Sequence, residues 1–196
     1  MTTLTLPLAQ AKSIASLINI AEGAKGIFSV LQYVKVNIAD NVLTAVATDR
    51  YVAGYGTYLL EDPIEDASFW LDATACKLIK AIKAPKYGHG FVTFEIDADA
   101  DVVVSDGVSS IRSGAPKGNY PDILGLIGGM AEATDGAKSV RLTLSKIAQI
   151  DKVAPSIGGV DAWHLTHMAS GREGKPGPVR FMNGNMILVL QPNLPR

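Results

Sequence analysis

The sequence contains a single cysteine, Cys76, among 196 residues. One thiol cannot form an internal disulfide, which excludes a disulfide-stabilised secreted scaffold and favours a reducing compartment. No apolar run reaches the roughly 18 to 20 residues that a membrane-spanning helix needs. The opening MTTLTLPLAQAK has neither the basic stretch nor the continuous apolar stretch of an export signal. We therefore expect a cytoplasmic protein that makes no contact with a membrane.

Residue patterns typical of catalysis or metal binding are sparse. His164 and His167 are three residues apart, a spacing that sends their side chains to opposite faces of a strand, the structure that their surroundings favour. Cys76 lies in a predicted helix with no histidine near it in sequence, as is typical of a packed core thiol. No glycine-rich phosphate loop stands between a strand and a helix. We predict no catalytic residue, no metal site and no cofactor.

The first 113 residues contain one arrangement twice. A short strand is followed by a helix with apolar residues three and four apart, then by three alternating strands, and the same order returns after residue 66. Asp40-Asn41 is typical of a tight hairpin turn, and Asp72 or Thr74 is placed to cap the second helix. The predicted class is α+β, with repeated β-α-β-β-β units and helices on one face of antiparallel sheets.

Residues 114–138 are rich in glycine and proline and are interpreted as the crossover to a second part. After them, LTLSKIAQIDKVA (142–154) resembles LTLPLAQAKSIA (4–15), which indicates that the unit begins again. Three further predicted strands follow, with a hairpin turn at Asn183-Gly184-Asn185, but no second helix. We predict a complete domain over residues 1–125 and an abbreviated second domain over residues 126–196.

Basic residues recur at regular spacing on the predicted helices. The helix near residues 74–84 carries a lysine every three residues, and the helix near residues 144–153 repeats that spacing with two lysines and a glutamine. A solvated helix face explains most such patterns. Because the total formal charge is −1, basic faces on equivalent helices also indicate an anionic polymer contacted through its phosphates. The candidates for this contact are Lys12, Lys77, Lys80, Lys83, Lys86, Lys146, Gln149 and Lys152.

The run ATDRYVA (47–53) places a polar turn within an apolar strand pair, and Asp49 is interpreted as a turn former that bonds local backbone amides. The run lies at the end of the third strand of its unit. There it is similar to the Ala-Thr-Asp-x-x-Arg-Leu-Ala-like run of the bacterial DNA polymerase III β sliding clamp. FWLDATACKLIKAIK (69–83) resembles the clamp's second strand-helix element, YPD (120–122) the entry into its next domain, and NMILVLQPNLPR (185–196) its final strand and tail.

This resemblance implies a DNA-clamp fold and a non-enzymatic processivity factor. Such a ring encircles duplex DNA without reading its sequence, its helices line the hole, and it tethers DNA polymerase and the clamp loader through short peptides. The chain is shorter than a three-domain clamp, which implies a reduced, phage-type form acting in a bacterial or phage-infected cell. The resemblance places the peptide pocket at Thr48, Arg50, Tyr51, Val52, Leu190, Gln191, Pro192 and Asn193.

Two assemblies and two other functions stay open. Two domains per chain would close a six-domain ring as a trimer, whereas three helices per chain would favour a tetramer. A clamp-fold adaptor that recruits replication proteins without closing a ring is the main alternative function. A small α+β hydrolase using a carboxylate or His89 is the other, although spacing assembles no nucleophile, base and orienting group.

Overall fold

The computed structural model describes residues 1–22, 29–84, 86, 90–132, 142–153, 162–170 and 176–192. The first unit opens with a strand whose buried and exposed residues alternate, and Pro7 is the N-cap of the helix that follows. Asp40 and Asn41 both have positive φ angles (50° and 61°), as the predicted hairpin turn requires. The elements are β1 (Thr2–Pro7), α1 (Leu8–Ser16), α2 (Ile18–Ala21), the 3-10 helix η1 (Ser29–Gln32), β2 (Val34–Ala39), β3 (Val42–Thr48) and β4 (Val52–Leu59).

The second unit repeats this order. Asp72 caps its helix by accepting a hydrogen bond from the Ala75 N–H at 2.7 Å, which confirms the predicted cap. Asp97 and Asp106 accept hydrogen bonds from backbone amides in the two turns that follow. The elements are β5 (Ala67–Leu71), α3 (Ala73–Ala81), β6 (Phe91–Ile96), β7 (Val102–Ser105) and β8 (Ser110–Ser113).

The two units are joined by exchanging their first strands. β1 pairs with β6, at the edge of the second unit's three strands, and β5 pairs with β2, at the edge of the first unit's three strands. The sheet orders are therefore β1-β6-β7-β8 and β5-β2-β3-β4. Each sheet is complete only when the other unit supplies one strand, so the two units form one folded body.

The later residues extend the second of these sheets. Their elements are α4 (Ile123–Gly128), α5 (Leu144–Asp151), β9 (His164–His167), β10 (Val179–Asn183) and β11 (Met186–Leu190). β11 pairs antiparallel with β4, giving a seven-stranded sheet of order β5-β2-β3-β4-β11-β10-β9. Gly54 allows this contact, because a Cβ there would lie 2.2 Å from Leu188 Cδ2. The helix and three-strand meander of a third unit are therefore present.

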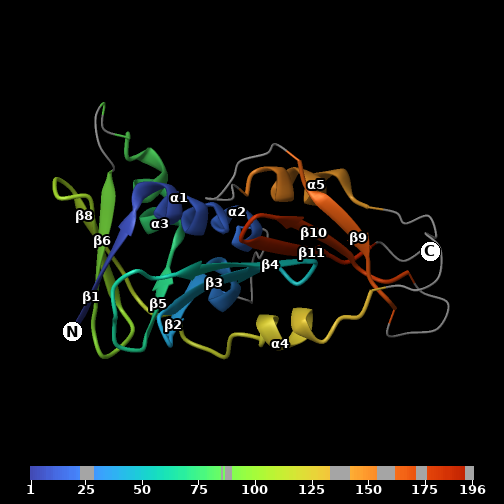
Figure 1. Cartoon of the computed structure of the whole chain (residues 1–196), viewed down its shortest axis with the longest axis horizontal. Helices are drawn as coiled ribbons and strands as arrows, with labels where there is room; N and C mark the ends of the chain where they lie inside the picture. Colours follow the sequence, from blue (N-terminus) through green and yellow to red (C-terminus); the bar gives the residue numbers. More distant parts are fainter. Residues whose placement is uncertain are drawn as a thin grey trace.

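Helices cover the two faces of the seven-stranded sheet unequally. Helices α1, α2, α3 and α5 lie on one side of it, and α4 lies on the opposite side (Figure 1). Residues of β3 alternate between these sides: Ala45 and Ala47 belong to the main core, whereas Val46 packs with Ile123 and Ile127 of α4. Alternation along one strand thus builds two apolar layers on one sheet.

The structure differs from the predicted elements in four places. α4 lies within the predicted crossover; Asp122 caps it and its Ile123 and Ile127 are buried. The first helix is interrupted at Leu17, next to Ser16, whose hydroxyl donates to the Ser13 carbonyl and competes with the helical backbone pattern. α3 ends at Ala81, because Ile82 leaves the helical conformation at ψ 125°. The strand predicted at residues 142–144 is not formed: Leu142 and Thr143 are in no strand, and Leu144 is the first residue of α5.

Candidate functional site

The Thr-Asp-Arg run forms the turn between β3 and β4. The side chain of Asp49 is fully buried, and its Oδ1 accepts hydrogen bonds from the N–H groups of Tyr51 and Val52 at 2.9 and 2.8 Å. Thr48 Oγ1 donates to the Val52 carbonyl at 2.9 Å and accepts from the Arg50 N–H. The prediction that Asp49 bonds local backbone amides is confirmed.

Asp49 also has a partner far away in the sequence. Its Oδ2 is bonded to Lys146 Nζ of α5, and the Lys146 side chain is 21% exposed. The same Nζ lies 5.4 Å from the centre of the Tyr51 ring, within range of a cation–π interaction. The turn is therefore attached to the third unit by a largely buried ion pair, which the sequence alone does not identify.

The C-terminal segment meets the same turn. The Gln191 N–H donates to the Tyr51 carbonyl at 2.9 Å, directly after the β4–β11 pairing ends. Tyr51 is 60% exposed, and Arg50 and Gln191 are also exposed. The remaining predicted pocket residues do not form this surface: Thr48, Val52, Leu190 and Pro192 are buried, and Asn193 lies outside the described residues.

An apolar layer on the other face of the sheet was not predicted. It consists of Ile123 and Ile127 of α4 on Val46, Ala53 and Val189, from β3, β4 and β11. A hollow of about 330 Å³ opens beside the start of α4, with Tyr120 and Lys35 among its lining. The sequence signal was present, because a capping Asp precedes two isoleucines four residues apart. Three glycines in the same segment argued against a helix there, because glycine has low helix propensity.

The structure places some of the predicted DNA-contact residues at the surface and others in contacts within the protein. The side chain of Asn19 on α2 accepts a hydrogen bond from Lys80 Nζ at 3.4 Å and donates to the Lys152 carbonyl at 2.9 Å. Residues of α2, α3 and α5 are therefore brought together at one point. Lys77, Lys80, Lys83, Lys86 and Lys152 are exposed and Lys12 is partly exposed, whereas Lys146 is bonded to Asp49 and Gln149 is partly buried. Lys83 lies beyond the end of α3.

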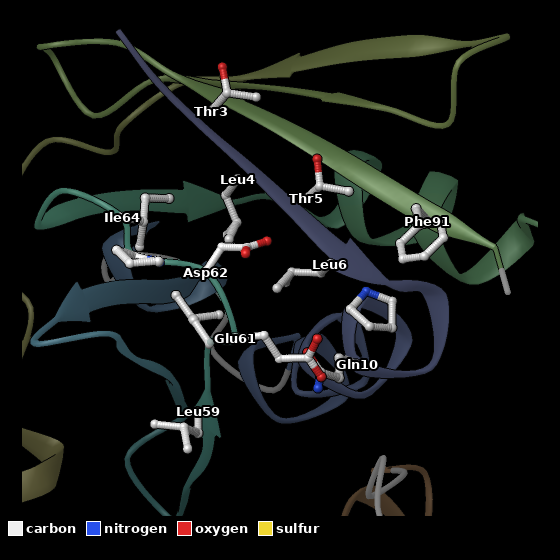
Figure 2. A pocket seen from close by; sticks show the side chains of 13 residues that line it. Thr3, Leu4, Thr5, Leu6, Gln10, Leu59, Glu61, Asp62, Ile64 and Phe91 are labelled. Atoms are coloured by element: carbon white, nitrogen blue, oxygen red, sulfur yellow. The ribbon is translucent and has the colours of Figure 1, made fainter.

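A separate groove of about 320 Å³ lies between β1 and the segment after β4. Figure 2 shows Leu4 and Leu6 pointing from β1 toward Glu61 and Asp62. Among the described residues that line it there is no histidine, cysteine or lysine, and His89 lies outside the described residues. The groove offers acidic and apolar contacts.

The single cysteine belongs to the core. Burial raises the pKa of the Cys76 thiol far above its ordinary value, so Cys76 is a neutral core residue. In the part of the chain that the structure describes, no three His, Cys, Asp or Glu side chains gather in a group able to hold a metal. His164 and His167 lie on β9, and His89 is outside the described residues. Among the described helices, none is long and apolar enough to cross a membrane.

Two units that exchange their first strands, with helices on one side of antiparallel sheets, define the sliding-clamp fold, and solved structures bear this out. The whole chain superposes on a DNA polymerase sliding clamp from Pseudomonas aeruginosa with a TM-score of 0.65, 14% identity and 65% of that chain covered. The superposition on the DNA polymerase III beta subunit from Thermotoga maritima has a TM-score of 0.64 at 14% identity. It covers all of this chain and 66% of that chain.

A third solved structure is a DnaN sliding clamp from Bartonella birtlesii bound to griselimycin. The superposition covers all of this chain and 66% of that chain, with a TM-score of 0.67 and 12% identity. The chain thus spans about two thirds of the length of these clamps. No family model matches the sequence, and no curated protein matches it. At 12 to 14% identity, the superposition of the structures carries this likeness, and it agrees with the fold that the sequence resemblance implies.

Proposed function

We propose that this protein is a non-enzymatic processivity factor that encircles duplex DNA as a homo-oligomeric ring. The observation that carries the proposal is the position of the lysine-bearing helices in a chain with the sliding-clamp fold. Lys80 and the Lys152 backbone meet at Asn19, on the side of the sheet opposite α4. Loose contacts of these lysines with phosphates would hold DNA without reading its sequence.

Within this proposal the DNA-facing surface consists of Lys12, Lys77, Lys80, Lys83, Lys86 and Lys152. Lys146 and Gln149, which the spacing also predicted, take a secondary part, because the charge of Lys146 is engaged by Asp49. The near-neutral total charge of −1 suits a ring that retains DNA by enclosing it. We propose two parts, residues 1–125 and 126–196, connected through α4, which spans the predicted boundary.

The proposed docking surface for DNA polymerase and clamp-loader peptides is the exposed group formed by Arg50, Tyr51 and Gln191. Tyr51 supplies an aromatic anchor, the residue type that dominates many peptide interfaces. Its position is fixed by the hydrogen bond from Gln191 and by Lys146 beside its ring. A clamp-fold adaptor that uses this surface without closing a ring is the alternative, and it requires no DNA contact from the helices.

Charge reversal separates these two functions. We expect the pair Lys80→Glu and Lys152→Glu to weaken DNA binding by at least tenfold in a salt titration, and to reduce the dependence on salt concentration, because fewer phosphates are neutralised. The matched control is Lys35→Glu, since Lys35 lies beside α4 on the opposite face. Equal effects of the pair and the control, or none from either, would favour the adaptor.

A further inference from the structure

The groove between β1 and the segment after β4 follows the edge of a strand (Figure 2). Residues 3–7 of β1 all line it. Because successive side chains of a strand point to opposite faces, a groove that contacts every residue of such a run lies along the strand's edge. β1 is the end strand of its four-stranded sheet, and its one partner strand in the described part of the chain is β6. The groove therefore adjoins the edge of β1 that faces away from β6.

The opposite wall of the groove is held in place by Asn41. The Leu60 N–H donates to the Asn41 carbonyl at 2.9 Å, and the Ile64 N–H donates to the Asn41 side-chain oxygen at 3.0 Å. Residues 61–63, between these two points, are exposed and line the groove. A wall fixed at both of its ends gives the groove a defined shape, so a ligand can bind without first ordering it.

The lining combines carboxylates with exposed apolar side chains. Residues 61–66 contain four acids and no basic residue, although the formal charge of the whole chain is only −1. Glu61 and Asp62 line the groove, and neither forms an ion pair with another described residue. Leu59 is 75% exposed and Phe91 is 54% exposed, and both also line it. Carboxylates repel the phosphates of nucleic acids, so the ligand that complements this groove is cationic and apolar.

We infer that the groove binds an extended peptide of a partner protein in which lysine or arginine alternates with large apolar side chains. The peptide backbone adds to the edge of β1 as a further strand. Its apolar side chains contact Leu59 and Phe91, and its cationic side chains pair with Glu61 and Asp62. Alternation is required because neighbouring side chains of an extended peptide point to opposite faces.

This groove is separate from the proposed docking surface at Tyr51. Tyr51 precedes β4 and Leu59 ends it, and a strand rises about 3.3 Å per residue, which places the two residues roughly 25 Å apart. None of the lysines assigned to DNA contact is among the described residues that line the groove. The inference therefore concerns a second binding site and does not depend on DNA binding.

A fluorescence titration with a labelled synthetic peptide tests the inference. The probe is a hexapeptide in which lysine and leucine alternate, matched in length to β1, and a hexapeptide of alternating glutamate and leucine is the control. We expect the lysine peptide alone to bind. Asp62→Lys should weaken this binding at least tenfold. Glu65→Lys is the matched control, because Glu65 belongs to the same acidic segment but is not among the groove's lining residues.

A second pair of variants tests the apolar contact. Phe91→Ala should also weaken binding of the lysine peptide at least tenfold, whereas Val108→Ala, at a 94% exposed position between β7 and β8, should leave it unchanged. All four substituted residues are exposed, so the fold should persist. In hydrogen exchange, we expect the β1 amides that do not bond to β6 to exchange more slowly when the lysine peptide is bound.

Several results would overturn the inference. They are equal binding of the two peptides, equal losses in Asp62→Lys and Glu65→Lys, or β1 amides that the peptide leaves unprotected. A solution mass of two chains that Asp62→Lys reduces to one would assign the groove to a second copy and overturn it as well. The Lys80→Glu and Lys152→Glu pair should not weaken peptide binding, so failure of the DNA-binding proposal is distinguishable from failure of this one.

Discussion

Lys146 of α5 is bonded through Nζ to Oδ2 of Asp49, although 97 residues separate them in the sequence. The carboxylate is fully buried, and its other oxygen holds the β3–β4 turn. This ion pair thus attaches the third unit to the first, in addition to the β4–β11 pairing and the Asn19–Lys152 hydrogen bond. Tyr51, the proposed peptide anchor, is positioned between the ion pair and the β4–β11 pairing.

Removing the lysine should cost more than neutralising the acid. Lys146→Met leaves Asp49 charged and buried, and we expect a loss of about 3 to 5 kcal/mol in the free energy of unfolding. Asp49→Asn should cost less, because Lys146 is partly exposed and can reach water. Urea denaturation of both single variants and the double variant measures the coupling. Lys117→Met, at an exposed position, is the control, and equal losses in all variants would contradict the assignment.

The pairing of β4 with β11 should not tolerate a larger residue at Gly54. A Cβ there would lie 2.2 Å from Leu188 Cδ2 and 3.1 Å from the Ile187 carbonyl oxygen. We expect Gly54→Val to destabilise the protein by about 1 to 3 kcal/mol or more, as overpacking does. Thermal unfolding measures the loss. Gly114→Val is the control, because a Cβ there would lie no closer than 3.5 Å to the nearest atom, and an equal loss there would contradict the packing explanation.

Stability should fall at alkaline pH because of Cys76. Burial raises the pKa of this thiol in the folded state, whereas an unfolded thiol titrates near pH 8.5. Below about pH 8.5 both states keep the proton. Above it only the unfolded state releases the proton, so stability falls by about 1.4 kcal/mol per pH unit. Unfolding measurements between about pH 8.5 and 10, below the ordinary titration of tyrosine, should show this slope in the wild type.

Cys76→Ala provides the comparison for that experiment. It removes the titrating group, so we expect the alkaline slope to flatten although the variant is less stable overall. Tyr58 and Tyr120, whose pKa values are also raised by burial, are unchanged in it. Parallel slopes for the wild type and the variant would show that Cys76 does not titrate in the unfolded state as assumed.

A substitution at the proposed peptide-binding surface should weaken peptide binding without changing the free energy of unfolding. We expect Tyr51→Ala to weaken binding of a polymerase-derived clamp-binding peptide at least tenfold in a fluorescence titration, because the aromatic contact is lost. Tyr51 is 60% exposed, so the unfolding free energy should change little. Tyr33→Ala removes an aromatic residue elsewhere and controls for general effects. Unchanged peptide affinity in Tyr51→Ala would move the docking surface away from this turn.

Local sequence patterns predicted most elements of the first two units. The alternation in β1 to β8, the Asp40-Asn41 turn and the Asp72 cap depend on neighbouring residues, so the sequence contains the required information. Asp49 as a turn former was predictable for the same reason. α4 was missed because its glycines have low helix propensity, and burial of Ile123 and Ile127 against the sheet overrides that propensity.

Contacts between distant segments were not predictable from spacing. Lys146 belongs to a regular basic pattern, yet its direction is set by how α5 packs, which turns it toward Asp49. The burial of Leu190 likewise follows from the pairing of β11 with β4. Periodicity identifies a helix face, but only tertiary packing decides what that face meets.

Retention on closed circular DNA tests the proposed function most directly. The protein is mixed with nicked plasmid at a concentration below that at which it assembles, then concentrated so that rings close around the DNA, and the complex is separated by size exclusion. We expect the protein to stay with the circle at moderate salt and to be lost when the plasmid is linearised. Equal retention on circular and linear DNA, or retention on neither, would contradict a DNA-encircling clamp.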